Sequence, residues 1–267
     1  MDGAFPIGPE VDSRPARRPE RVAIEGAWVR LVPLDAARHP DALWSGTGGA
    51  GNESLWRYMG EGPFPDRAAF DAHLRTKAAS DDPLFYALVD QAAPDGAAGT
   101  RRESYPTPPV NDTRPAWGMS PDLPRILSPT SSGRALGYAA LMRIEPKHRV
   151  IEVGNIVYAQ ALQRTRGATE AMYLLARYVF EDLGYRRYEW KCDALNEPSR
   201  RAALRLGFSF EGVFRQHMLI KGRNRDTAWF SMLDSEWPLR KQEFERWRAP
   251  SNFDPEGRQK TSLRTKE

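Results

Sequence analysis

The feature that most constrains the fold is the stretch from residue 152 to residue 207, where the period of the apolar residues changes from that of a strand to that of a helix and back. Residues 150–158 are β-branched and free of proline, which predicts a strand. Between residues 168 and 183, apolar side chains recur at i, i+3, i+4 and i+7, which predicts a helix with one buried face. Gly184 is a natural end for that helix. We therefore expect a sheet with a helix packed on it.

The turn that enters this helix is a candidate anion site. It carries two arginines, two hydroxyl side chains and a glycine, at a place where four backbone amides have no acceptor within the helix. The helix dipole and these amides favour a phosphate, and arginines add charge-assisted hydrogen bonds. An ordinary capped helix with a solvated basic turn is the alternative. The residues concerned are Gln163, Arg164, Thr165, Arg166, Gly167, Ala168 and Thr169.

Beyond the helix, residues 187–193 predict a strand, residues 197–206 a short helix, and a further strand begins at Phe208. Together with the turn, the segments Asn196-Glu-Pro-Ser199 and Leu206-Gly207-Phe208 make this stretch resemble the acyl-CoA-binding half of the GNAT N-acetyltransferases, in the RimJ/RimL-like branch. The resemblance covers roughly residues 24 to 240. It implies an α+β GNAT fold, with a single mixed, mostly antiparallel twisted sheet that contains a central splayed strand pair and is flanked by helices.

The resemblance also implies a cosubstrate, acetyl-CoA, and no metal. Its diphosphate is expected on the turn described above, and its pantetheine arm beside the strand end at Asn155, Ile156 and Val157, with Asn196 nearby. This chain departs from the family loop, usually Gln/Arg-x-x-Gly-x-Gly/Ala, because Arg166 stands where the middle glycine is expected and Gly167 follows one place later. The loop is therefore expected either to bend differently or to hold its anion with more side chain and less backbone.

The catalytic acid is expected to be Ser199, since the tyrosine that many GNAT enzymes use is replaced here by Ala203. In the resembled branch the serine of Asn-x-x-Ser is thought to contact the sulfur of CoA. The alternative is that Ser199 only caps the helix that follows, a role that Asn196 could share.

The base has two candidates. The glutamate expected on the strand after Phe-x-x-Glu-Gly is Met218 here, and its neighbour His217 is expected on the opposite side of that strand by two-residue alternation. Glu152, on the central strand, can serve directly or through water. The alternative for Glu152 is a structural pair with a nearby arginine.

Composition excludes several classes of protein. One cysteine, Cys192, rules out an internal disulfide framework, and four histidines without close spacing to it give no zinc pattern. A net charge of +4, from 39 basic and 35 acidic residues, contains no basic block that would indicate nucleic-acid binding. The chain has no apolar run of the roughly 20 residues that cross a bilayer and no signal peptide pattern. We therefore expect a cytoplasmic protein without nucleic-acid or membrane partners, either monomer or homodimer.

The rest of the chain is expected to complete one domain. Residues 1–23 are rich in proline and arginine and predict a disordered lead-in, residues 24–248 the GNAT domain, and residues 249–267 a polar tail. Residues 91–133 contain many prolines and predict an insertion between two strands. Asp35 is expected to cap a helix through Trp44, and a closing hairpin to turn over residues 222–225.

The predicted function is an acetyl-CoA-dependent N-acetyltransferase that transfers an acetyl group directly to a primary amine, in a small molecule or at a peptide or protein N-terminus. The alternative is a catalytically weak or inactive GNAT-fold module that binds acyl-CoA. The missing tyrosine and the methionine at position 218 favour that alternative.

Overall fold

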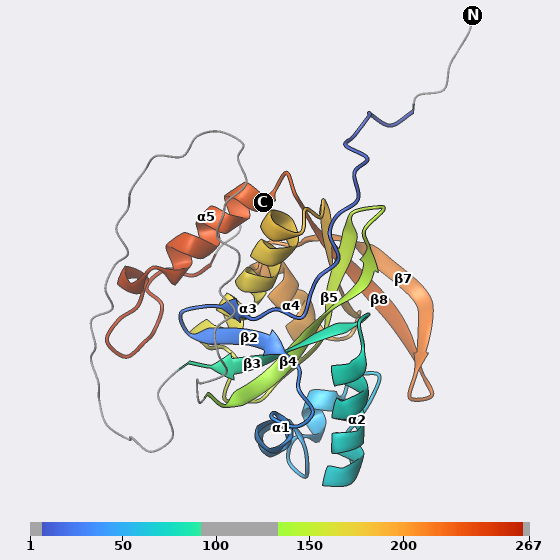
Figure 1. Ribbon diagram of the computed structural model, residues 1–267, viewed down its shortest axis with the longest axis vertical. Coiled ribbons are helices and arrows are strands. Elements are labelled where there is room, and N and C mark those ends of the chain that lie inside the picture. The colour runs from blue at the N-terminus through green and yellow to red at the C-terminus, as the bar shows by residue number, and fades with distance from the viewer. Residues whose placement is uncertain (1–6, 92–132, 264–267) are drawn as a thin grey trace, which may run out of the picture.

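The computed structural model describes residues 7–91 and 133–263, and the predicted insertion, apart from its two end residues, lies outside them. An eight-stranded sheet in the order β1-β2-β3-β4-β5-β6-β8-β7 forms the centre of the molecule (Figure 1). The strands are β1 Ile24–Glu25, β2 Val29–Pro33, β3 Leu84–Asp90, β4 Ala135–Glu145, β5 Val150–Tyr158, β6 Arg187–Asp193, β7 Ser209–Ile220 and β8 Arg223–Leu233. Only β5 and β6 pair in parallel. The predicted mixed, mostly antiparallel sheet is thus confirmed.

Helices cover the sheet on both faces, as Figure 1 shows. They are α1 Pro40–Thr47, α2 Arg67–Ala79, α3 Arg166–Arg177, α4 Glu197–Arg205 and α5 Trp237–Arg248, with short turns η1 Glu53–Trp56, η2 Tyr178–Asp182 and η3 Pro250–Asn252. On one face α3 and α5 pack on residues such as Ile151, Val153 and Tyr188. On the other face α1 and α2 pack on residues such as Phe85 and Tyr138. Helix α2 buries one side, with Phe70, Leu74 and Lys77, whereas α3 is buried on nearly all sides, from Thr169 to Ala176, because it lies between the sheet and other segments of the chain.

A bulge in β5 changes which face its side chains meet. Tyr138 of β4 lies opposite Val157 and Ala140 lies opposite Gly154, so two residues of β5 oppose one residue of β4. Asn155, in the bulge, has a φ of 50°, in the left-handed region. As a result Val157 joins the core beneath α1 and α2, whereas Val153 belongs to the core beneath α3. The bulge falls at the strand end predicted to contact the cosubstrate.

Two local expectations differ from the structure. Helix α1 begins at Pro40, and the Asp35 carboxylate instead accepts hydrogen bonds from the amides of Ala37 and Arg38 in the preceding turn. The closing hairpin turns at Lys221 and Gly222, with φ values of 49° and 71°, so β8 starts directly after them. Two consecutive positive φ values are typical of a two-residue type I′ turn, which matches the twist of the flanking strands.

The chain ends also differ from the expected lead-in and tail. The amides of Ala16 and Arg17 donate to the carbonyls of Pro146 and Leu183, so part of the N-terminal segment lies along the domain. Residues 249–263 fold back on α5, where Phe253 is 8% exposed and Leu263 4% exposed. These apolar anchors are too few and too irregularly spaced to produce a periodic signal in the sequence.

A buried carboxylate in α3 is hydrogen-bonded both to the segment that leads into β2 and to the end of α5. Glu170, fully buried, accepts hydrogen bonds from the consecutive amides of Ala27, Trp28 and Val29 at 2.9, 2.6 and 3.1 Å. The Arg248 guanidinium at the end of α5 also donates to it, with 3.0 Å from Nε to Oε1. Three amide donors and one guanidinium satisfy a charge that would otherwise be very costly to bury.

Candidate active site

The site is organised by strands β5 and β6, which part halfway along their length. Their parallel pairing runs from Val150 opposite Arg187 to Val153 opposite Trp190 and then stops. Strand β5 continues to Tyr158, while β6 stays paired with β8 as far as Asp193 opposite Thr227. The edge of β5 at residues 155–157 that faces β6 therefore has no strand partner in the described chain. The predicted splayed pair is present, and its free backbone groups face the gap.

The entrance of α3 presents exposed donors. Thr165 is the N-cap, and its Oγ1 accepts a hydrogen bond from the Ala168 amide at 3.2 Å. Arg164, with a φ of 61°, is exposed. Arg166 is the first residue of the helix, and its guanidinium carbon lies 5.0 Å from the ring centre of Trp28 and 4.9 Å from that of Phe253. Within residues 7–91 and 133–263, neither arginine donates to a carboxylate or carbonyl.

Other residues of the predicted anion turn are occupied by contacts within the protein. Gln163 Nε2 donates to the carbonyl of Tyr158 at 3.0 Å and so fixes the turn to the end of β5. Gly167 is buried, and a Cβ there would meet Leu162 and Val29 at 3.6 Å, so its open side faces the core instead of a ligand. Thr169 Oγ1, also buried, accepts from the Arg205 guanidinium at 3.1 Å. The expectation that Gly167 lets the backbone approach a ligand is therefore not favoured.

Ser199 and Asn196 divide the two roles predicted for the start of α4. Asn196 is the N-cap, and its Oδ1 accepts from the Ser199 amide at 3.2 Å. The Ser199 hydroxyl instead accepts from Trp190 Nε1 at 3.0 Å. Burial raises the pKa of the nearby Cys192 thiol, and a hydrogen bond from Ser199 opposes that rise. Ser199 is thus not the helix cap, and its hydroxyl is held beside β6, just beyond the point where β5 and β6 separate.

Glu152 belongs to a network of charged side chains on the sheet face. Its Oε2 lies 3.1 Å from Arg143 Nε and 2.9 Å from Lys191 Nζ. Lys191 Nζ also lies 2.7 Å from Glu189 and 3.8 Å from the ring centre of Trp229. Burial raises the pKa of Glu152, while Lys191 and Arg143 oppose that rise. A buried carboxylate held by two cations fits the structural interpretation of Glu152 better than that of a free base.

His217 lies on the sheet face that two-residue alternation did not predict. Strand β7 carries extra residues between Phe214, opposite Thr227, and Met218, opposite Arg225. This irregularity turns His217 toward β8, where Nδ1 lies 2.9 Å from Thr227 Oγ1 and the ring lies 6.1 Å from that of Trp229. Since alternation holds only in a regular strand, the bulge places His217 on the face that carries the Glu152 network.

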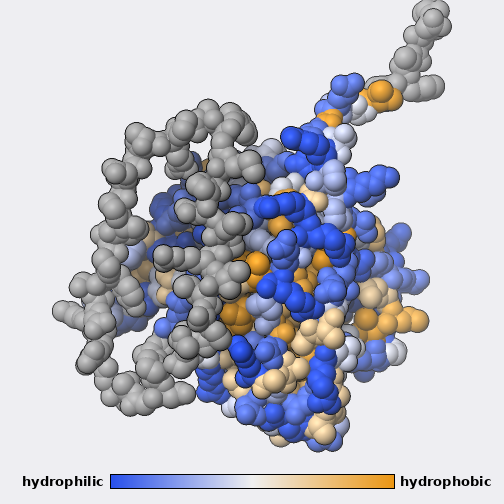
Figure 2. Space-filling model, viewed as in Figure 1, coloured by the Kyte–Doolittle hydropathy of each residue, from blue (hydrophilic) through white to orange (hydrophobic). Residues whose placement is uncertain are grey.

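A bridge crosses the same face from the α1–α2 connection. Tyr58 Oη donates to the carbonyl of Leu195, before α4, at 3.1 Å. Lys221 Nζ, at the tip of the β7–β8 hairpin, donates to the carbonyl of Trp56 at 2.9 Å. Residues 214–217 line a shallow open hollow on the hairpin, and Figure 2 shows apolar side chains on the hairpin's exposed part, where Leu219 is 83% exposed. The α1–α2 connection is thus hydrogen-bonded both to the segment before α4 and to the tip of the hairpin.

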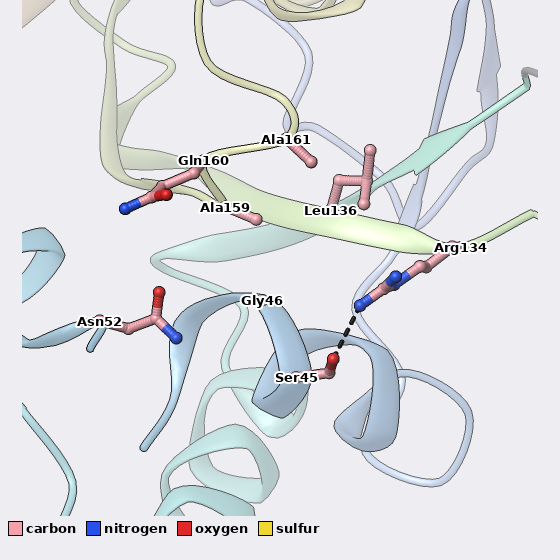
Figure 3. A pocket seen from close by; sticks show the side chains of 8 residues that line it. All are labelled: Ser45, Gly46, Asn52, Arg134, Leu136, Ala159, Gln160 and Ala161. Carbon is pink, nitrogen blue, oxygen red and sulfur yellow. Dashed lines mark hydrogen bonds between the residues drawn. The ribbon is translucent and has the colours of Figure 1, made fainter. Parts of the chain in front are cut away.

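A second hollow, of about 220 Å³, lies between α1 and the loop after β5. Figure 3 shows Asn52 and Gln160 on one side of it and Arg134 on the other, with an Arg134 Nη2 hydrogen bond to Ser45 Oγ at 2.8 Å. No residue predicted from the sequence lines it, because its walls come from segments far apart in the chain.

Two buried tyrosine hydroxyls lie on the strands β5 and β6, which part from one another. Tyr158 Oη, at the end of β5, and Tyr188 Oη, on β6, have no hydrogen-bond partner in the described chain. Burial raises the pKa of Tyr188, and the neighbouring Tyr158 raises it further. Orphaned buried donors are costly, and amide carbonyls of a ligand can satisfy them. Together with the free edge of β5 and the unpaired arginines, this donor set fits acyl-CoA.

The comparisons with known proteins agree with this geometry. The family model described as an acetyltransferase (GNAT) domain matches residues 29–209, more than half of the sequence. A solved structure from Brucella melitensis, described as a GCN5-related N-acetyltransferase, is 44% identical with a TM-score of 0.77, and the match covers 94% of this chain and 96% of that one. The chain therefore belongs to the GNAT acetyltransferase family.

Two further relatives extend the comparison. A solved structure from Chromobacterium violaceum assigned to the GNAT family is 36% identical, with a TM-score of 0.67, over 88% of this chain and all of that one. A Bacillus subtilis protein provisionally named ribosomal N-acetyltransferase YdaF is 30% identical over 105 residues, 39% of this chain and 57% of that protein. The matched stretch spans little more than half of this curated relative, and its name is in line with the predicted RimJ/RimL-like branch.

Proposed function

We propose that the protein is an acetyl-CoA-dependent N-acetyltransferase that transfers the acetyl group directly to a primary amine. The observation that carries the proposal is the parting of β5 and β6 after Val153 and Trp190, beside the basic entrance of α3. Acetyl-CoA, when bound, supplies an activated acetyl thioester. The free amides of residues 155–157 would polarise its carbonyl, and Arg164 and Arg166 would hold its diphosphate.

Proton transfer is assigned to Ser199 and His217. After accepting from Trp190, the Ser199 hydroxyl can direct its proton either to the neighbouring Cys192 thiol or to a departing thiolate, which suits protonation of that thiolate. His217 Nε2 has no partner in the described chain, and the ring lies on the sheet face that the α1–α2 connection crosses. It is therefore the better placed of the two predicted bases, because Glu152 is already held by Arg143 and Lys191.

The acceptor is a primary amine on a peptide or protein N-terminus, or on a small molecule. The hollow at residues 214–217 is open and shallow, which suits the end of a chain better than a fully enclosed small ligand. The name of YdaF refers to the ribosome and adds support for a protein N-terminus.

The test combines calorimetry with a thiol-release assay. The protein is titrated with CoA and then incubated with acetyl-CoA and a panel of amines that includes short peptides with free N-termini. Release of free thiol that depends on one class of amine supports the proposal. Tight CoA binding without thiol release across the panel would favour the binding module, for which Ala203 and Met218 are the motivation.

Ser199 and Asn196 allow the catalytic role to be separated from helix capping. We expect Ser199→Ala to lower kcat while leaving the Kd for CoA nearly unchanged, because the hydroxyl is needed mainly when charge develops on the sulfur. Asn196→Ala removes the cap and should instead cost about 1 kcal/mol of stability. Turnover and thermal melting of both variants check this. A Ser199→Ala protein with normal kcat would remove Ser199 from the mechanism.

A further inference from the structure

The side chains of Trp28, Arg166 and Phe253 form an aromatic corner at the entrance of α3. The two rings are 5.7 Å apart and inclined by 71°, and the guanidinium rests against both, at 5.0 and 4.9 Å. Each such contact stabilises the cation and restricts the orientation of its side chain. Arg166 is therefore held in place, although it stands on the surface turn of a helix.

This arginine lacks the acidic partner that its neighbour has. Arg248 also lies over the Trp28 ring, at 5.9 Å, but its guanidinium is paired with the buried carboxylate of Glu170. For Arg166, the described residues supply aromatic contacts and no hydrogen-bond acceptor. A guanidinium has five N–H donors in one plane, and contacts with ring faces satisfy none of them. Arg166 is thus fixed in orientation with its donors available, as a binding site for an anion requires.

One wall of the aromatic corner comes from residues beyond the matched family region, which ends at residue 209. Phe253 is 8% exposed and packs edge-on against Trp247 at 5.3 Å. Asn252, its neighbour, ties the segment together: its Nδ2 donates to the carbonyls of Trp247 and Thr261 at 2.9 and 3.0 Å. Phe253 is therefore a built part of this chain and not the start of a loose tail.

We propose that Phe253 and Trp28 are positioning residues for Arg166, and that the aromatic corner makes residues 249–263 part of the site that holds the diphosphate of the acyl donor. The proposal rests on the proposed use of acetyl-CoA. The proposal accounts for the arginine that replaces the middle glycine of the family loop. The Arg166 side chain would supply hydrogen bonds to the diphosphate in place of backbone amides, and a side chain held in one place loses less conformational entropy on binding.

The test compares CoA with pantetheine, which lacks the whole 3′-phospho-ADP part, and with dephospho-CoA, which keeps the diphosphate and lacks only the 3′-phosphate. Calorimetry with these ligands is carried out on the wild type and on Arg166→Ala, Phe253→Leu and Phe253→Tyr. Each variant should weaken CoA and dephospho-CoA by the same factor. We expect Arg166→Ala to weaken CoA roughly 10- to 100-fold. Phe253→Leu, which keeps apolar bulk but removes the ring, should weaken it roughly 3- to 10-fold. Phe253→Tyr should stay within twofold of the wild type, and pantetheine binding should be unchanged in all three.

The control is Arg14→Ala, which removes one positive charge from an exposed arginine that is paired with Asp12 and lies outside the proposed site. It should leave the binding of all these ligands unaffected. Equal weakening of CoA and pantetheine by Phe253→Leu would show that Phe253 acts on the fold in general and would overturn the inference. Unchanged CoA binding in Phe253→Leu would overturn it as well. A wild-type protein that binds no CoA at all would instead remove the proposed function on which it rests.

Discussion

Two charged regions of the molecule differ in how their charges are balanced. On the sheet face, three cations and three carboxylates pair with one another: Arg143, Lys191 and Arg187 with Glu152, Glu189 and Glu211. At the entrance of α3, Arg164 and Arg166 have no acidic partner in the described chain. The centre of the sheet network, Glu152, Lys191 and Glu189, is buried, whereas Arg164 is exposed. We infer from this difference that the paired charges stabilise the fold and that Arg164 and Arg166 are available to bind an anionic ligand.

The largest effect is expected from breaking the paired region at Lys191, whose side chain is 4% exposed. Lys191→Met leaves two buried carboxylates without their shared cation, which should lower the free energy of unfolding by roughly 3–5 kcal/mol. Urea unfolding measures this. As control, Lys147→Met on the exposed turn before β5 should change stability by less than about 0.5 kcal/mol. Adding Glu152→Gln and Glu189→Gln to Lys191→Met should restore part of the loss, and an unchanged midpoint for Lys191→Met alone would refute a structural role for the network.

A smaller effect, and of another kind, is expected at the unpaired region. Arg164→Ala should weaken CoA binding roughly tenfold, equivalent to about 1.4 kcal/mol, because one charge-assisted contact with the diphosphate is lost. Its unfolding midpoint should match that of the wild type, since Arg164 makes no contact to lose within the described chain. Calorimetry and urea unfolding of the same preparation check both. A destabilised Arg164→Ala protein with normal CoA affinity would show that Arg164 stabilises the fold and does not bind CoA, contrary to the prediction.

The smallest effects concern the pH dependence of stability, and they compare two carboxylates of the sheet network, Glu152 and Glu211. Burial raises the pKa of Glu152, whereas the hydrogen bond from Arg187 lowers that of Glu211. A carboxyl with a raised pKa binds more protons in the folded chain, so its contribution to stability is lost as pH rises through that value. A carboxyl with a lowered pKa contributes stability that is lost as pH falls through its folded value.

Above the ordinary glutamate pKa of about 4.5, Glu152→Gln should therefore make the slope of unfolding free energy against pH more positive than in the wild type. Below that pH, Glu211→Gln should make the slope less positive. Urea unfolding at closely spaced pH values measures both slopes. Changes of the same sign in the two variants would show that the two carboxylates do not differ as their surroundings indicate.

The sequence predicted those parts of the fold in which apolar residues recur at the regular spacing of a strand or a helix. Strand β5, helix α3 and strand β6 lie where the apolar pattern put them, and the splay followed from the family resemblance. His217 was placed on the wrong face because alternation cannot anticipate a bulge. The bulge is held by Asp226, whose Oδ1 accepts hydrogen bonds from the Gln216 amide at 2.7 Å and from Asn224 at 2.9 Å. The spacing of apolar residues does not reflect these hydrogen bonds across the hairpin, so it could not predict the bulge.

The candidate site was predictable in outline only. Residues 163–169 were grouped correctly at the entrance of α3, but which of them turn inward depends on partners from other segments, such as Arg205 for Thr169 and Tyr158 for Gln163. Phe253 and Lys191 were missed for the same reason. Their importance comes from contacts with residues distant in the chain, and a single sequence records composition and period but not those contacts.

The carboxylate of Glu170 has a consequence for the order in which the protein can be made. Its partners come from residues 27–29 and from Arg248, so the charge in α3 is fully satisfied only after α5 has been synthesised. A chain still held in the ribosome tunnel beyond residue 230 would have all eight strands nearly complete and yet carry an inward-facing anion without its guanidinium. We therefore expect the nascent domain to stay open to proteases until α5 has emerged from the ribosome and Arg248 can reach Glu170.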